Sequence, residues 1–155
     1  MSNTSERAAE EFIERMGVIA EADGLPRIAG RLMALLVLEG GPFSFTVLAE
    51  RLQVSRGSIS TNTRLLEQFG IIERIARPGD RQDYFQIASD PYVRLLRASV
   101  ERMSKSRDLV VRTRTRLPKT QTGAHKRLNE LENFYRATIE GLSAAAHSYS
   151  LEPVA

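Results

Sequence analysis

The sequence predicts a mainly α-helical protein with one small β-hairpin, and three observations support this fold class. Apolar residues recur every three or four positions along most of the 155-residue chain, which is the period of amphipathic helices. The period shortens to two only within residues 71–87, where two short runs flank a Pro-Gly pair. The helical patterns at 91–116 and 122–149 are long, and their apolar seams exceed what one small domain can cover.

Two helices are predicted before residue 40. The first, 4–21, has a stripe of apolar residues and ends at Asp23-Gly24. Pro26 opens the second, because proline is tolerated in the first turn of a helix. The run Leu32–Leu38 is apolar almost all round, which predicts a central position for this helix, and Gly40-Gly41-Pro42 ends it.

A short extended piece at 43–45 leads into a third predicted helix, 46–52, and a tight connection then leads to a fourth, 56–69. Ser55 is expected to be the N-cap of the fourth helix, because its hydroxyl can accept a hydrogen bond from an unpaired N–H of the first turn. Gly70 is expected to end that helix in the left-handed conformation.

The two strand-like runs, 71–76 and 82–87, are predicted to form the β-hairpin. Arg77 and Arg81 lie on either side of its Pro-Gly turn. Asp80 would be repelled by a polyanion, so we expect it to pair with an arginine and to stabilise the hairpin tip.

Asp90 and Pro91 begin the fifth predicted helix, which continues to residue 116. The last helix, 122–149, has mostly apolar residues spaced alternately by three and four positions, which is typical of a helix that packs lengthwise against others. These residues are Leu128, Leu131, Tyr135, Thr138, Leu142, Ala145 and Tyr149.

The charge is distributed unevenly along the chain, although 22 Lys and Arg against 19 Asp and Glu give a formal net charge of only +3. Residues 56–116 contain 13 basic and 7 acidic side chains, a net of +6, and the remaining 9 basic and 12 acidic side chains give −3. This pattern indicates a polyanion partner for the basic middle. A helix surface covered by salt bridges would give some of the same asymmetry.

The composition excludes several functional classes. The absence of cysteine excludes disulfides, thiolate nucleophiles and Cys-ligated metals. His125 and His147 lie roughly 33 Å apart on one predicted helix, so they cannot share a metal ion within a chain. Because no arrangement of nucleophile, base and acid is present, we expect neither an enzyme nor a cofactor. The apolar runs are too short for a membrane span, and no apolar signal core precedes the first helix, so we expect a cytoplasmic protein.

The central elements follow the order helix, short connection, second helix and β-hairpin, which is the order of a winged helix-turn-helix. In such a domain the second helix enters the major groove of DNA. Arg56, Ser60 and Arg64 lie on one stripe of this helix, and an arginine can donate two hydrogen bonds to guanine. Asn62 remains open between a base contact and a partly buried role.

The hairpin then serves as the wing, and its two tip arginines can reach a minor groove or the flanking phosphates. The N-terminus of helix 56–69 adds free N–H groups that suit a phosphate. The residues expected to contact DNA are Ser55, Arg56, Gly57, Ser58, Ser60, Thr61, Asn62, Arg64, Arg77 and Arg81.

The segment VSRGSISTNTRLLEQFGIIERIARPGDRQDYFQI resembles the DNA-binding core of MarR-type transcriptional regulators. The upstream FIERMGVIAEADGLPRIAGRLMALLVLEGGPFSFTVLAERL is similar to the GbsR-like subgroup, and the resemblance is strong from about residue 12 to 87. It implies a homodimer that binds a near-palindromic operator and represses transcription until an effector changes the spacing of the two DNA-binding domains. The positions that match the family's recognition helix are Arg56, Ser58, Ser60, Thr61 and Arg64, and Arg81 matches its wing arginine.

A dimer is also expected on physical grounds, because one recognition helix makes too few base contacts for useful specificity. The chain then divides into an N-terminal packing helix (1–24), the DNA-binding domain (25–89) and a C-terminal dimerisation region (90–155). The alternative is that the terminal helices pack only on each other within the monomer. The residues expected at the dimer interface are Phe12, Met16, Leu128, Leu131, Tyr135 and Leu142.

The resemblance also implies an effector, because GbsR-like relatives are similar to sensors of choline or glycine betaine. A quaternary ammonium offers no hydrogen bond and is held by aromatic ring faces. This chain has no tryptophan, which departs from a Trp-containing cage. The candidate cage residues are Phe43 and Phe45, near the expected junction of the DNA-binding and dimerisation regions.

Two other functions stay open at this point. A winged helix can serve as a protein-interaction module whose basic wing binds an acidic partner. A nucleoid-type protein binds DNA without sequence preference. A sequence-specific regulator differs from both, because it keeps a large ratio between operator and random DNA as salt rises.

Overall fold

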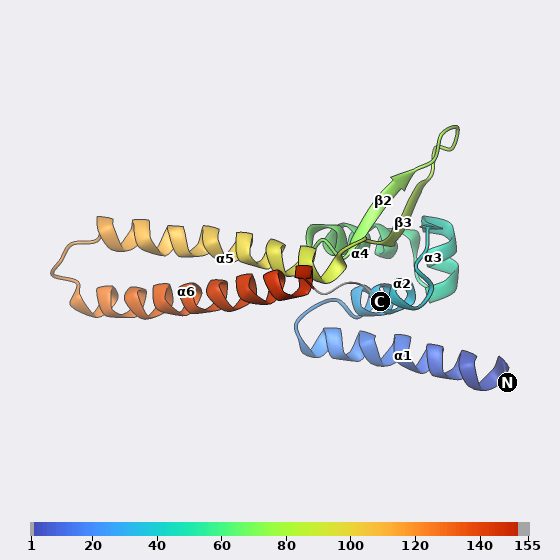
Figure 1. The fold of residues 1–155 in the computed structure, drawn as a ribbon, viewed down its shortest axis with the longest axis horizontal. Coiled ribbons are helices and arrows are strands. Elements are labelled where there is room, and N and C mark those ends of the chain that lie inside the picture. The colour runs from blue at the N-terminus through green and yellow to red at the C-terminus, as the bar shows by residue number, and fades with distance from the viewer. Residues whose placement is uncertain (1, 152–155) are drawn as a thin grey trace. The chain divides into compact units, whose positions relative to one another are not determined.

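The structure is a computed structural model, and it describes residues 2–151. Its elements in chain order are α1 (Ser2–Ala22), α2 (Arg27–Glu39), β1 (Phe43–Ser44), α3 (Phe45–Leu52), α4 (Arg56–Gln68), β2 (Ile72–Ala76), β3 (Asp83–Ile87), α5 (Pro91–Arg116) and α6 (Thr122–Leu151), as Figure 1 shows. The chain forms two compact units, and the boundary between them falls after Pro91. Within the described range, no helix is both long and apolar enough to cross a membrane.

Helix α2 is the centre of the first unit, as the sequence predicted. Helices α1, α3 and α4 and strand β3 all contact it. Leu32, Leu35 and Leu36 expose at most 1% of their surface. Val37 and Leu38 are exposed instead, because the helix is close to its C-cap at Gly40 and its last turn leaves the core.

Helices α1 and α2 approach each other closely at a glycine. A Cβ atom added to Gly30 would lie 2.4 Å from the carbonyl oxygen of Met16 and 2.6 Å from the Cβ of Ala20. At the rim of this contact, the Nε of Arg31 lies 2.7 Å from a carboxylate oxygen of Glu14. Helix α1 is therefore held on α2 by close backbone packing inside and by ion pairing outside.

The sheet has three antiparallel strands in the order β1-β3-β2. Strands β2 and β3 form the predicted hairpin, with Ile72 opposite Ile87 and Ala76 opposite Asp83. We call residues 72–87 the wing. The extended piece predicted at 43–45 forms a third strand, because β1 pairs with β3 and places Phe43 opposite Phe85.

Two local features explain the third strand. Gly41 has a φ of +91°, and a Cβ atom there would lie 2.7 Å from the carbonyl oxygen of Phe85, so glycine lets the chain run close beside β3. Ser44 then accepts a hydrogen bond from the N–H of Val47 at 3.3 Å and caps α3. The helix therefore begins at Phe45, which the sequence had assigned to the extended piece.

The second unit consists of α5 and α6, which run antiparallel beside each other (Figure 1). Arg114 and Glu132 form an ion pair of 2.5 Å between them, and the rings of Tyr92 and Tyr149 meet edge-on at 5.9 Å. The seam predicted for α6 faces α5 only in part, because Leu131, Ala145 and Tyr149 are exposed while Leu128, Tyr135 and Leu142 are half-buried.

Candidate nucleic-acid interface

The N-terminus of α4 is capped as the sequence predicted. The Oγ of Ser55 accepts a hydrogen bond from the N–H of Ser58 at 3.1 Å, and the two serine hydroxyls lie 3.1 Å apart. At the other end, Gly70 has a φ of +75°, which confirms the predicted left-handed conformation. The cap fixes where α4 begins, so it also fixes the position of the side chains in its first turn.

One side of α4 faces the core. Ile59, Thr63 and Leu66 are almost fully buried. Asn62 lies on the same side, exposes only 5% of its surface, and donates from Nδ2 to the carbonyl of Ser58 at 2.8 Å. Of the two roles that the sequence left open for Asn62, this geometry matches the buried one, so we leave it out of the DNA contacts proposed below.

The other side of α4 faces solvent. Arg56, Gly57, Thr61 and Arg64 are exposed, and Ser60 is half-buried. No hydrogen bond or ion pair joins Arg56 or Arg64 to another residue of the described range 2–151. A Cβ atom on Gly57 would meet only the Oγ of Ser55, at 3.8 Å, so packing does not require glycine there. This side therefore presents two free guanidinium groups and a small, uncrowded residue between hydroxyl side chains.

The tip of the wing is held by Tyr84. Its hydroxyl donates to Asp80 at 2.7 Å, and the N–H of Gln82 donates to the other carboxylate oxygen at 2.9 Å. The guanidinium carbon of Arg77 lies 4.0 Å from the centre of the Tyr84 ring. Asp80 was expected to pair with an arginine: its main partners are instead the Tyr84 hydroxyl and backbone N–H groups, and Arg77, which stacks on the tyrosine, adds a smaller electrostatic attraction.

These contacts shift two ionisation equilibria. The hydrogen bond from Tyr84, followed by that from the backbone of Gln82, lowers the pKa of Asp80 below its ordinary value. The same bond to Asp80 raises the pKa of Tyr84. The Asp80 carboxylate therefore faces Tyr84 within the wing, while the Arg81 side chain is exposed and has no hydrogen-bond or ion-pair partner in the part of the chain that the structure describes.

Arg74 joins the wing to α4, and sequence reasoning did not single it out. Its guanidinium donates to both carboxylate oxygens of Glu67, at 3.3 and 3.2 Å, and to Asp83 at 3.2 Å. The hairpin register places Arg74 and Asp83 diagonally on neighbouring strands, which is the one sequence signal that points to this contact. No comparable sequence signal points to the contact between Arg74 and Glu67, because Glu67 lies on the preceding helix.

The residues expected at an effector site or a dimer interface are spread over both units. Phe43 is half-buried on β1, and the ring of Phe45 packs edge-on against Phe85 at 4.9 Å. Phe12 is exposed and Met16 half-buried on α1. On α6, Leu131 is exposed, and the three half-buried residues are Leu128, Tyr135 and Leu142.

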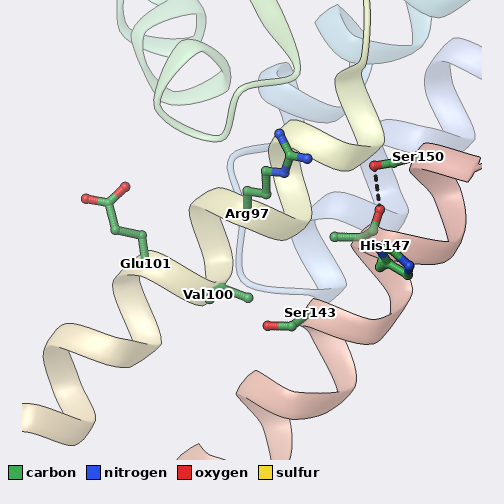
Figure 2. A pocket seen from close by; sticks show the side chains of 7 residues that line it. Arg97, Val100, Glu101, Ser143, His147 and Ser150 are labelled. Carbon is green, nitrogen blue, oxygen red and sulfur yellow. Dashed lines mark hydrogen bonds between the residues drawn. The ribbon is translucent and has the colours of Figure 1, made fainter.

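Neither histidine lies in a cluster of possible metal ligands. The described residues include no group of three His, Asp or Glu side chains that could hold a metal ion. His125 Nε2 lies 3.3 Å from the carbonyl oxygen of Pro118. His147 lines a cavity of about 390 Å³ between α5 and α6, together with Arg97, Val100 and Ser143 (Figure 2).

Comparison with known proteins identifies the family. Residues 23–83 match the model of the MarR family. The HTH-type transcriptional regulator MmpR5 of Mycobacterium tuberculosis is 36% identical over 141 residues, which cover 90% of this chain and 86% of that protein. The putative HTH-type transcriptional regulator YvaV of Bacillus subtilis is 29% identical over 87 residues, 56% of this chain and 49% of that protein.

The fold agrees with these relationships. A crystal structure of a transcriptional regulator is 34% identical in sequence and superposes with a TM-score of 0.82, covering 94% of this chain and 99% of that one. The capped helix α4, the helix α3 before it and the wing after it are the parts of a winged helix. The chain therefore belongs to the MarR family of DNA-binding winged-helix transcriptional regulators.

Proposed function

We propose that this protein is a homodimeric repressor that binds a near-palindromic operator, with α4 in the major groove and the wing at the minor groove or the backbone. One observation carries the proposal: α4 exposes Arg56 and Arg64 without partners, on a helix whose cap and buried side are fixed. The two residues lie eight positions apart, or roughly 12 Å along the helix axis. That distance lets both guanidinium groups reach the same groove.

Other groups on this surface suit the DNA backbone. Ser55, Ser58, Ser60 and Thr61 carry hydroxyls around the start of α4, where the helix dipole also favours a phosphate. Arg77 and Arg81 supply positive charge at the wing tip. We assign base reading to Arg56 and Arg64, and phosphate or minor-groove contact to the hydroxyls, Gly57 and the wing.

Exposed apolar side chains support the homodimer. Phe12 and Ile19 on α1, and Leu131 and Phe134 on α6, are large and exposed in the single chain. A second copy would remove them from water. We therefore keep 1–24 and 90–155 as dimerisation regions and 25–89 as the DNA-binding domain.

The proposal includes a small effector and a cytoplasmic location, and it assigns no enzyme activity. The effector is a quaternary-ammonium solute that reaches Phe43, and the support is the resemblance to GbsR-like regulators. Calorimetric titration of the purified protein with choline and glycine betaine tests it, and Phe43→Ala should abolish the heat of binding. Absence of binding heat for the unaltered protein excludes these two ligands.

The test of DNA reading is selection of bound sequences from a random duplex pool at about 150 mM salt. We expect a two-fold symmetric consensus with half-sites about one helical turn apart. Arg64→Ala should weaken operator binding by about 1–3 kcal/mol and relax the preference at one base pair. Arg7→Ala, which removes an exposed arginine from α1, is the matched control and should bind like the parent. A pool without enrichment would leave the nonspecific and protein-binding alternatives.

A further inference from the structure

Arg74 joins three elements of the first unit, its own strand β2, α4 and β3. It lies on β2, donates to both carboxylate oxygens of Glu67 on α4, and donates to Asp83 on β3. Its guanidinium carbon also lies 5.4 Å from the ring centre of Phe85, a fully buried core residue. The guanidinium group of Arg74 therefore has the Phe85 ring as one neighbour and the carboxylates of Glu67 and Asp83 as its hydrogen-bond acceptors.

The shape of this contact suits arginine alone. A planar guanidinium can donate two parallel bonds to one carboxylate and a further bond to a second carboxylate, whereas a lysine ammonium is a point charge without that fixed fork. The hydrogen bond that Arg74 donates to Glu67 is the main cause that raises the pKa of Arg74, so the group stays charged at any working pH. We call the contact among Glu67, Arg74 and Asp83 the arginine bridge.

The position of the bridge relates it to DNA reading. Glu67 follows Arg64 by three residues, so it lies one turn along α4 from a proposed base contact. Asp83 begins the strand that returns from the wing tip. The bridge thus connects the proposed major-groove element with the element proposed to contact the flanking DNA.

We infer that the arginine bridge fixes the wing relative to α4 and thereby sets the spacing between the major-groove contact and the wing contact. Arg74 is a positioning residue in this inference, and Glu67 and Asp83 are its anchors. The inference rests on the proposed function, because it assumes that α4 and the wing bind the same operator half-site.

The double variant Glu67→Gln/Asp83→Asn tests the inference, because simple electrostatics and loss of wing positioning predict opposite changes in operator affinity. It removes two negative charges from each DNA-binding domain, so simple electrostatics predicts tighter binding to any DNA. If the bridge positions the wing, operator affinity should instead fall about tenfold while affinity for random duplex does not fall. Hydroxyl-radical cleavage should lose protection at the flanks of each half-site and keep it at the centre.

Two further variants complete the design. Arg74→Lys keeps the charge and should lose the same flank protection, because the fork is missing. Glu39→Gln removes the partner of Arg51, an ion pair of similar exposure (46% for Arg51 against 43% for Arg74) that joins α2 to α3. This control should keep the parent's footprint and should not weaken operator binding, although it also removes a negative charge and breaks an interhelical pair.

The result that overturns the inference is flank protection equal to that of the parent in the double variant, whatever the affinity. A loss of operator binding together with loss of the central protection would also overturn it, because α4 itself would then be disturbed. Failure of the proposed function is distinguishable from both, since the unaltered protein would then select no consensus and show no footprint.

Discussion

Serine side chains begin both helices of the helix-turn-helix. Ser44 caps α3 and Ser55 caps α4, each through a hydrogen bond to a backbone N–H three residues later. Such caps satisfy a donor that the helix itself leaves unpaired. Each cap therefore fixes the first turn of its helix, and for α4 that turn carries the proposed DNA contacts.

Removing the α4 cap should lower the stability of the protein. Ser55→Ala is expected to reduce the free energy of unfolding by about 1 kcal/mol, because an N–H of the first turn loses its partner. Urea denaturation followed by circular dichroism measures this. Ser143→Ala, at an exposed position inside α6, is the control and should raise stability slightly, since alanine favours helix. Equal stability of Ser55→Ala and the parent would contradict the capping role.

The wing tip should depend on pH through Asp80 and Tyr84. The lowered pKa of Asp80 means that its contribution is complete above about pH 4 and is lost as the pH falls through the lowered value. The raised pKa of Tyr84 means that its contribution is complete below about pH 10 and is lost as the pH rises further. The contact is thus intact across the whole physiological range.

Tyr84→Phe should raise the pKa of Asp80 toward its ordinary value, because the main hydrogen bond that favours the carboxylate is removed. Carboxyl carbon chemical shifts followed by NMR over a pH titration give this value directly. Glu101, whose pKa is lowered by Lys105 in the other unit, is an internal control and should titrate as before. An unchanged pKa of Asp80 would mean that Gln82 and Arg77 stabilise its carboxylate without the tyrosine.

At the scale of elements, the packing of α1 on α2 depends on the absence of a side chain. Gly30→Ala should lower the free energy of unfolding by about 1–3 kcal/mol, because the new Cβ overlaps the carbonyl of Met16 and the helices must move apart. Denaturant unfolding of the two proteins measures the difference.

A second glycine gives the matched control. A Cβ atom at Gly141 in α6 meets nothing within 4 Å, so Gly141→Ala should raise stability by about 0.5–1 kcal/mol through helix propensity alone. A stabilised Gly30→Ala would contradict the close approach of α1 and α2.

Elements whose signals are local could be predicted from the sequence, and those whose contacts are distant could not. Ser55 and Gly70 mark the ends of α4 because capping involves residues only a few positions apart. The extended conformation at 43–45 was predicted, but its pairing with β3 was not, because the partner residues lie about forty positions further along the chain. The bond between Tyr84 and Asp80 depends on the twist and rotamers of the hairpin tip, which spacing does not determine.

The candidate site follows the same rule. The exposed stripe of Arg56 and Arg64 could be read from helical periodicity, because that period shows which side of α4 is apolar. Asn62 could not be assigned, since a small polar side chain fits either side of a helix. Arg74 was missed because its partner Glu67 lies across a turn whose geometry is set by the packed core.

At the scale of the whole molecule, exposed apolar residues predict that the chain associates. Phe134 exposes 58% of its surface in the single chain, and Leu131 lies beside it on α6. Phe134→Asp should raise the dissociation constant of the dimer about 100-fold, since two symmetry-related phenylalanines each lose about 1.5 kcal/mol of burial. Sedimentation velocity over a range of concentrations measures the change.

Val47→Asp is the control for this prediction. It places the same charge at an exposed apolar residue of α3, outside the regions proposed to dimerise, and should leave the dissociation constant unchanged. A Phe134→Asp protein that sediments like the parent would place the dimer interface elsewhere or leave the protein monomeric.

The sheet itself is protected from joining another sheet. Because β3 lies in the middle, β1 and β2 are the edges, and β1 offers only two residues to a new strand. Strand β2 is longer, but Glu73 and Arg74 place opposite charges on its two faces. Charged side chains on an edge strand disfavour the edge-to-edge growth that leads to fibres, because a new strand would have to desolvate them. Self-association through the backbone is thereby discouraged, which leaves the exposed helical surfaces for the dimer proposed above.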